Sequence, residues 1–204
     1  MPGTIVCFGD SNTYGYDSRE FGGGRYPKRV RWTGLLEERT DCKILNRGVC
    51  GREIPHTRGQ IEPVRLQIQE WRKEPAPVWL WIMLGGNDLL MNAGYRAEDA
   101  AARMQFFLNE LKKEPAIASG EIKIRLIAPP YVWYGTWITE ERIYQESRRM
   151  DDAYRKISEK MGIAFTPAGA WDIPVVFDGI HYSEDGHRKF ADKIMETIIS
   201  ADKF

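Results

Sequence analysis

Seven consecutive apolar residues, Val78–Leu84, constrain the fold more than any other stretch of the chain. Pro75 and Pro77 end the preceding helical pattern just before this run, and Gly85 follows it. A strand that is apolar at every position is usually covered on both faces, as in a parallel sheet between two layers of helices. The run therefore predicts the central strand of an α/β fold.

Strands alternate with helices along the rest of the chain, which predicts one doubly wound domain over residues 1–204. Further strands are predicted at residues 4–8, 43–46, 122–127 and 163–165. Helical spacing of apolar residues predicts helices at 31–39, 61–73, 97–113, 140–161 and 183–199. The expected fold is a flavodoxin-like α/β domain of about five parallel strands with helices on both faces.

Composition excludes several classes of partner. The 29 Lys and Arg residues balance 29 Asp and Glu residues, so no basic excess indicates nucleic-acid binding. No apolar run approaches the ~18 residues of a membrane span, and residues 1–8 lack a signal-peptide pattern. The three cysteines, Cys7, Cys42 and Cys50, lack the spacing of metal ligands. We therefore expect a cytoplasmic protein with reduced thiols and no membrane partner.

Ser11 follows the first predicted strand, where Gly9 ends the apolar run. In open α/β sheets, ligands bind at the carboxyl ends of the strands. A serine at this edge can present both its hydroxyl and its backbone N–H to a substrate. The alternative is an ordinary turn, because Gly-Asp-Ser is also a common turn sequence. The glycine-rich stretch at residues 15–28 that follows is either the rim of a site or a mobile surface loop.

Asp178 precedes His181 by three residues, just before the last predicted helix. A carboxylate at this spacing can fix the tautomer of the imidazole, so that the other ring nitrogen accepts a proton from a serine. Structural packing of His181 is the alternative. The other two histidines, His56 and His187, are interpreted as surface or structural residues.

Two further strand ends offer hydrogen-bond donors for a developing oxyanion. Asn87 follows the apolar strand at 78–84, and its amide has two N–H donors and no charge. Gly51 follows the strand at 43–46, and a glycine there permits close approach to its backbone N–H. The alternatives are that Asn87 or Asp88 caps the next segment and that Gly51 lies in a plain turn.

Ser11, Gly51, Asn87 and the Asp178–His181 pair, in this order, resemble the SGNH hydrolase family, also called the GDSL esterases and lipases. The resemblance spans the chain from residues 8–11 to residues 178–181. It implies Ser11 as nucleophile, His181 as general base and Asp178 as the residue that orients His181. It also implies an oxyanion hole of the Ser11 and Gly51 backbone N–H groups and the Asn87 side chain.

Residues 15–16 and 31–34 resemble the bacterial arylesterase and acyltransferase branch of that family, whose members are often oligomers. A homo-oligomer is therefore expected. Two positions depart from the family pattern. Asn12 replaces the leucine of the GDSL motif, and Cys50 stands beside Gly51 without an evident role. Neither change removes a catalytic group.

An aromatic segment at residues 131–137 follows the fourth predicted strand, on the edge where the catalytic residues are expected. Its rings are predicted to enclose a small acyl pocket, with Tyr16, Trp133, Trp137 and Ile180 as substrate-binding residues. The alternative is that the rings pack on a helix or in a subunit interface.

The expected function is a metal-free, cofactor-free serine esterase that cleaves short-chain acyl esters, with a small-molecule ester such as a sugar acetate as substrate. A thioesterase or a lysophospholipase would use the same triad with a longer pocket. A metal-dependent phosphoesterase would use Asp10, Asn87, Asp178 and His181 as ligands, although two metals usually need more ligands than these. A non-catalytic binding protein is the remaining alternative.

Overall fold

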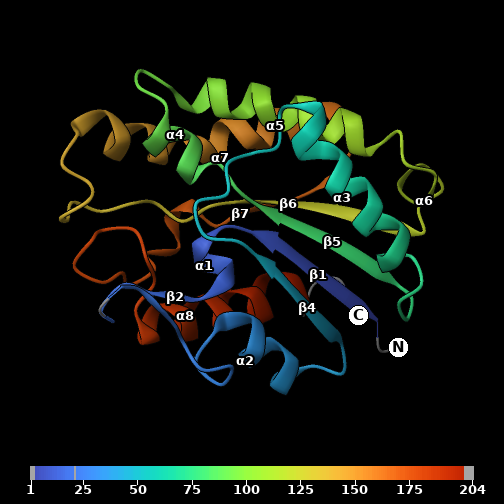
Figure 1. Cartoon of the computed structure of the whole chain (residues 1–204), viewed down its shortest axis with the longest axis horizontal. Coiled ribbons are helices and arrows are strands. Elements are labelled where there is room, and N and C mark those ends of the chain that lie inside the picture. The colour runs from blue at the N-terminus through green and yellow to red at the C-terminus, as the bar shows by residue number, and fades with distance from the viewer. Residues whose placement is uncertain (1–2, 21, 200–204) are drawn as a thin grey trace.

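Five parallel strands form the central sheet of the computed structural model, which describes residues 3–20 and 22–199 (Figure 1). In spatial order they are β4 (Lys43–Gly48), β1 (Thr4–Gly9), β5 (Val78–Met83), β6 (Ile122–Ala128) and β7 (Ala164–Pro167). Numbered along the chain, this order is 2-1-3-4-5, the flavodoxin-like arrangement. The predicted α/β fold with a doubly wound parallel sheet is confirmed.

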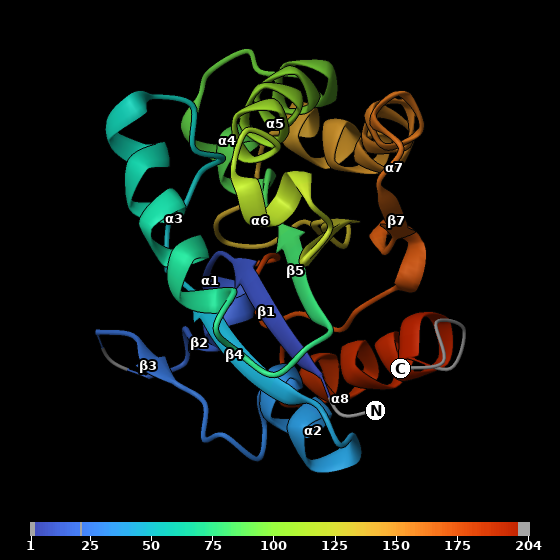
Figure 2. The ribbon, with the colours of Figure 1, turned by 90° about the vertical axis from the view of Figure 1, so that its right-hand side faces the viewer.

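Helices cover both faces of the sheet (Figure 2). Successive side chains of a strand point to opposite faces. Val6 and Phe8 of β1 therefore enter the core beneath α3, α5 and α7, whereas Ile5 and Cys7 enter the core beneath α2 and α8. The bounds of these helices are Trp32–Arg39 for α2, Arg58–Trp71 for α3, Ala97–Leu111 for α5, Glu141–Met161 for α7 and Glu184–Ile194 for α8.

Several element boundaries differ from the prediction for local reasons. Helix α3 begins at Arg58 rather than at residue 61, because Thr57 and Gln60 form a capping box at its start. The last helix is not continuous to residue 199: α8 ends at Ile194, and a π-helical turn, η2, covers Met195–Ile199. The ends of the predicted domain, residues 1–2 and 200–204, lie outside the described residues, as does Phe21.

Several short elements lie outside the predicted helices and strands. They are α1 (Ser11–Tyr14), α4 (Gly86–Met91), α6 (Pro115–Ala118) and the 3₁₀ turn η1 (Gly169–Trp171). The glycine-rich stretch contains a two-stranded antiparallel ribbon of β2 (Tyr16–Asp17) and β3 (Gly24–Arg25). Among residues 3–20 and 22–199, none of the helices has the length and apolar character needed to cross a bilayer.

Candidate active site

The turn between β1 and α1 places Ser11 at the carboxyl edge of the sheet. Asp10 caps α1, and its carboxylate accepts a hydrogen bond from the Asn12 backbone N–H at 2.9 Å. Gly9 is required for close packing, since a Cβ atom there would lie 2.1 Å from Thr13 Oγ1. Ser11 begins α1 and is buried.

Ser11, His181 and Asp178 form a continuous chain of hydrogen-bonding contacts. The Nε2 atom of His181 lies 3.0 Å from Ser11 Oγ, and its Nδ1 atom lies 2.8 Å from Asp178 Oδ2. All three residues are buried. With its proton on Nδ1 donated to Asp178, the imidazole turns the Nε2 lone pair toward the serine hydroxyl, as a general base requires.

Asp178 is held by four hydrogen-bond donors. Burial alone would raise its pKa, but hydrogen bonds from the His181 ring, the Ser18 hydroxyl and two backbone N–H groups lower the pKa to about 2. Ser18 Oγ donates to Oδ2 at 2.6 Å, and the N–H groups of Ile180 and His181 donate to Oδ1 at 2.8 and 2.9 Å. The carboxylate therefore stays ionised at neutral pH. Ser18 was not predicted as a site residue.

Asn12 ties the nucleophile turn to the segment that holds His181. Its Nδ2 donates to the Ile180 carbonyl at 3.1 Å, and its Oδ1 accepts from the Tyr182 N–H at 3.0 Å. These two partners flank His181 on either side. The residue that replaces the leucine of the GDSL motif thus links the segment of Ser11 to the segment of His181.

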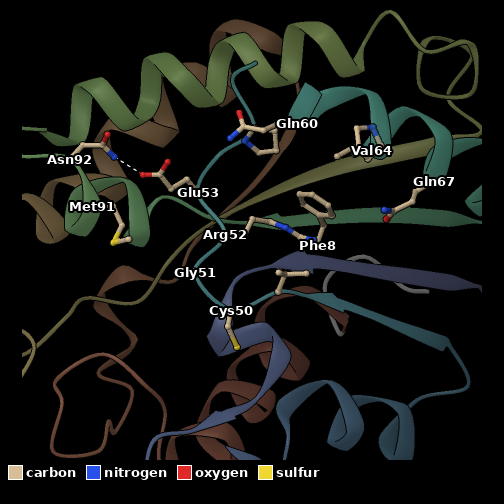
Figure 3. Close-up of a pocket in the computed structure, with 13 residues that line it drawn as sticks. Phe8, Cys50, Gly51, Arg52, Glu53, Gln60, Val64, Gln67, Met91 and Asn92 are labelled. Atoms are coloured by element: carbon tan, nitrogen blue, oxygen red, sulfur yellow. Dashed lines mark hydrogen bonds between the residues drawn. The ribbon is translucent and has the colours of Figure 1, made fainter. Parts of the chain in front are cut away.

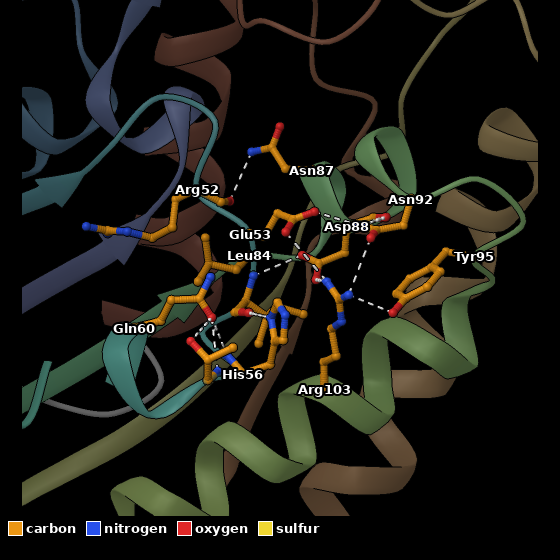
Figure 4. A network of polar contacts seen from close by, with 12 residues as sticks. Arg52, Glu53, His56, Gln60, Leu84, Asn87, Asp88, Asn92, Tyr95 and Arg103 are labelled. Carbon is orange, nitrogen blue, oxygen red and sulfur yellow. Dashed lines mark hydrogen bonds and ion pairs between the residues drawn. The ribbon is translucent and has the colours of Figure 1, made fainter. Parts of the chain in front are cut away.

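A sharp turn at Gly85 brings Asn87 to the same edge. Gly85 has φ 120°, a conformation that favours glycine, and a Cβ atom there would lie 2.3 Å from the Tyr154 hydroxyl. Asn87 lies in the first turn of α4, and its Nδ2 donates to the Arg52 carbonyl at 3.0 Å (Figure 4). Gly51, with φ 72°, immediately precedes Arg52.

Asp88, next to Asn87, is buried and lies in a polar network with Glu53, Asn92 and Arg103 (Figure 4). Its carboxylate accepts hydrogen bonds from the Ile54 N–H and from Arg103, both at 3.0 Å. Asp88 thereby anchors the loop after β4 to α5, which is a structural role.

A cavity of about 460 Å³ opens beside Ser11 and His181. The Tyr16 and Trp137 rings lie 4.7 and 5.3 Å from the His181 ring, measured between centroids. The lining residues are Ser11, Tyr16, Cys50, Gly51, Asn87, Leu90, Met91, Trp137, Ile180 and His181. The structure thus brings together at one cavity every predicted catalytic, oxyanion and substrate residue except Asp178, which lies behind His181, and Trp133.

Trp133 does not line this cavity. Its backbone N–H is bonded to the Gly179 carbonyl at 2.9 Å, and its ring lies 5.1 Å from the guanidinium carbon of Arg148. Arg148 holds this part of the segment against α7 through the carbonyls of Val132 and Tyr144. Trp133 therefore packs on a helix, which was the alternative to its predicted place in the substrate pocket, whereas Trp137 lines the cavity as predicted.

A second cavity, of about 670 Å³, adjoins the first (Figure 3). Cys50, Gly51 and Met91 line both. Beyond them its walls carry polar side chains, including Arg52, Glu53, Gln60, Gln67 and Asn92. The two cavities therefore differ in character, because the first is largely apolar and the second combines polar with apolar side chains.

Two other buried titratable groups lie near the triad. Burial raises the pKa of Asp10 to about 6, although the Asn12 N–H and the charges of His181 and Arg52 oppose this effect. Burial lowers the pKa of His187 to about 3, and its Nδ1 accepts a hydrogen bond from the Trp32 N–H at 3.4 Å. His187 has a structural role, in agreement with its interpretation from the sequence.

The described part of the chain contains neither a metal-binding cluster nor a disulfide. Within the described part of the chain, His, Cys, Asp and Glu side chains do not gather in groups of three that could hold a metal ion. Cys7, Cys42 and Cys50 are free thiols, the first two buried and the third exposed.

Comparison with known proteins places this geometry in a family. The model of the GDSL-like lipase/acylhydrolase family matches residues 7–189. A sequence comparison with curated proteins finds no significant match.

Similar solved structures share the fold over almost their whole length. The aryl esterase of M. smegmatis is 21% identical, with a TM-score of 0.80 over 97% of this chain and 99% of that one. Est24, a carbohydrate acetylesterase from Sinorhizobium meliloti, is 21% identical, with a TM-score of 0.79 over 98% and 99%. A carbohydrate acetylesterase family member from the same organism is 19% identical, with a TM-score of 0.82 over 100% of both chains. From the family match and the shared fold, we conclude that this chain belongs to the GDSL-like lipase/acylhydrolase family of carboxylic ester hydrolases.

Proposed function

We propose that the chain, folded as a single domain, is a serine esterase that hydrolyses short-chain acyl esters through an acyl-enzyme. The observation that supports this function best is the continuous contact of Ser11, His181 and Asp178 beside an apolar cavity. The reaction uses side chains and backbone groups of the protein and needs no cofactor.

In the first step, Ser11 Oγ attacks the ester carbonyl carbon and its proton moves to His181 Nε2. The negative charge on the carbonyl oxygen is stabilised by the N–H groups of Ser11 and Gly51 and by the Asn87 side chain. The carbon–oxygen bond to the alcohol then breaks, and His181 returns the proton to the alcohol. Water repeats the sequence on the acyl-enzyme, which releases the acid and restores the serine. Asp178 orients the imidazole throughout.

The acyl group is proposed to be short, with acetyl as the preferred case. Tyr16, Trp137, Leu90 and Ile180 occupy much of the wall of the 460 Å³ cavity. The adjoining cavity carries polar side chains, among them Arg52, Glu53 and Asn92, that can form hydrogen bonds with a hydroxylated group. Acetylated carbohydrates are therefore the proposed substrate class, and two of the similar structures are described as carbohydrate acetylesterases. A thioesterase or a lysophospholipase would need a longer apolar channel.

A serine-reactive phosphonate tests the mechanism. Its mass should appear on the peptide that contains Ser11, and Ser11→Ala should abolish both labelling and hydrolysis of p-nitrophenyl acetate. Ser119→Ala, at the exposed end of α6, serves as the matched control and should keep full activity. Full activity in Ser11→Ala, or activity that a chelator removes, would overturn the proposal and favour a metal-dependent phosphoesterase. A binding protein without catalysis would show neither labelling nor hydrolysis.

We further propose a cytoplasmic homo-oligomer. The buried free thiols Cys7 and Cys42 support a reducing compartment. Four exposed aromatic side chains lie on two neighbouring loops, which are joined by a hydrogen bond from the Thr136 N–H to the Phe177 carbonyl. We propose that a second copy of the chain covers them. These side chains are Trp133, Tyr134, Trp137 and Phe177. Sedimentation of the parent and of Phe177→Ser tests the assembly, and a monomeric parent would refute it.

A further inference from the structure

Arg52 follows Gly51 in the loop after β4, and its side chain reaches the Phe8 ring while its backbone carbonyl contacts Asn87 (Figures 3 and 4). Its Nη1 atom donates to the Gly9 carbonyl at 2.9 Å and also to the Arg47 carbonyl. Its guanidinium carbon lies 4.1 Å from the centroid of the Phe8 ring. The side chain therefore joins the end of β1, two residues before Ser11, to the loop that follows β4.

The backbone of Arg52 contacts the third donor. Its carbonyl accepts a hydrogen bond from Asn87 Nδ2 at 3.0 Å. A carboxamide has two N–H groups. Because Arg52 binds one of them, the plane of the Asn87 amide is fixed and the second N–H is left for a substrate oxygen.

Gly51 gains little support from packing. A Cβ atom built at Gly51 would have no neighbour within 4 Å, and no helix or strand includes residues 49–57. The position of its N–H therefore depends on the hydrogen bonds that hold the loop. Two of these hydrogen bonds reach the Gly9 carbonyl, one from the Val49 backbone N–H at 3.1 Å and one from the Arg52 side chain at 2.9 Å, and only the second comes from a side chain.

We infer that Arg52 is a positioning residue for the oxyanion hole, one that aligns the donors of Ser11, Gly51 and Asn87 without contacting the substrate oxygen. The inference rests on the proposed function, because it presumes that these three groups stabilise the oxyanion. Donors in such a site must be held within about 0.5 Å of the productive geometry. An arginine bound to two backbone carbonyls and lying over an aromatic ring restricts the loop in this way, since its contacts on both sides are fixed in the core or at the strand ends.

The test compares Arg52→Met, Asn87→Ala and the double variant on p-nitrophenyl acetate. Loss of an oxyanion donor typically lowers kcat about 10²–10³-fold, and we expect this for Asn87→Ala. Arg52→Met should lower kcat about 10–100-fold and leave KM within about threefold, because alignment matters mainly in the transition state. The double variant should lose less than the product of the two single losses, since both act on the same donors. Arg52→Lys, which keeps a donor for the carbonyls, should recover most of kcat.

Arg25→Met is the matched control. Arg25 also donates to a backbone carbonyl at 2.9 Å, that of Tyr14, lies 4.1 Å over the ring of the same residue, and is exposed to solvent. The kcat of Arg25→Met should equal that of the parent. Every kcat is expressed per serine titrated with the phosphonate, so that a misfolded fraction does not count as a catalytic loss. If Arg52→Met does not fold, Arg52→Gln, which is too short to bridge the two carbonyls, replaces it.

The outcomes distinguish failure of the proposed oxyanion hole from failure of the role inferred for Arg52. An Asn87→Ala variant with unchanged kcat would contradict the oxyanion hole itself. A large loss in Asn87→Ala together with parent-like kcat per titrated serine in Arg52→Met, or Arg52→Gln, would refute the inference alone. Strictly multiplicative losses in the double variant would also refute it, because Arg52 would then act independently of Asn87.

Discussion

Acid should destabilise the protein through His187, and the size of the effect follows from the surroundings of this residue. His187 is fully buried, with the Tyr26 and Tyr182 rings at centroid distances of 5.1 and 5.4 Å. Burial and the nearby charge of Arg31 lower its pKa from 6.5 to about 3. The folded protein therefore holds a neutral imidazole at a pH where the unfolded chain binds a proton.

The change in the free energy of unfolding with pH follows from this difference in proton binding. Between pH 6.5 and about 3 the unfolded state binds more protons, so the free energy of unfolding falls as the pH falls. The loss is about 1.4 kcal/mol per pH unit, or about 3 kcal/mol at about pH 4.5. This is a large part of the roughly 5–15 kcal/mol that stabilises a typical domain.

Asp10 and Asp178 respond to acid differently. Because the pKa of Asp10 is raised from 3.8 to about 6, the folded state takes up this proton first, and the free energy of unfolding rises by about 2 kcal/mol over the same interval. The pKa of Asp178 is lowered to about 2, so its contribution is lost only as the pH falls from 3.8 toward that value. Both aspartates are present in the parent and in His187→Leu, so their contributions cancel when the stabilities of the two proteins are compared.

The assay is urea unfolding of the parent and of His187→Leu, followed by tryptophan fluorescence at pH 7 and about pH 4.5. The variant leaves the Trp32 N–H without its acceptor, a cost that does not depend on pH and cancels between the two conditions. The stability advantage of the parent over the variant should shrink by about 3 kcal/mol on acidification. A constant difference would refute the assignment of a buried neutral imidazole.

Asn12→Leu should lower kcat by up to roughly 30-fold, because it removes both hydrogen bonds that flank His181, each worth about 1 kcal/mol. Steady-state kinetics per titrated serine measures this, and an unchanged kcat would contradict it. Asp178→Asn should lower kcat by about 10⁴ at neutral pH by leaving the imidazole in the wrong tautomer. A variant as active as the parent would reduce the triad to a dyad. Trp137→Ala should shift the preference among p-nitrophenyl esters toward longer acyl chains, by up to ~0.8 kcal/mol for each methylene accommodated. An unchanged chain-length profile would assign that ring to packing.

The sheet and the edge at which Ser11, Asn87 and His181 meet could be predicted because the relevant signals are local. The apolar run at 78–84 identifies a strand buried on both faces, and parallel strands bring their carboxyl ends to one edge. Ser11 and Asn87 follow two such strands, so their meeting is a consequence of topology. Asp178 and His181 are only three residues apart, and their contact is nearly a local one.

Other features depend on contacts between distant segments, which periodicity and spacing do not indicate. Ser18 meets Asp178 across 160 residues of sequence, and Asn12 meets Ile180 across 168. Helix α4 spans only Gly86–Met91, too short to show an apolar repeat. Trp137 lines the cavity, whereas the Trp133 ring lies against Arg148 of α7. Both tryptophans belong to the same aromatic segment, and the sequence does not indicate this difference.

The hydrogen bond between Ser11 and His181 closes a loop of 170 residues. Such a long closure comes late in folding, because its entropic cost must be met by contacts that form earlier. Intermediates with much of the sheet assembled would therefore lack the proposed general base, His181, beside the proposed nucleophile, Ser11. In a refolding experiment, recovered hydrolysis would report completion of the native structure, and it should lag behind the return of tryptophan fluorescence from the core around β5.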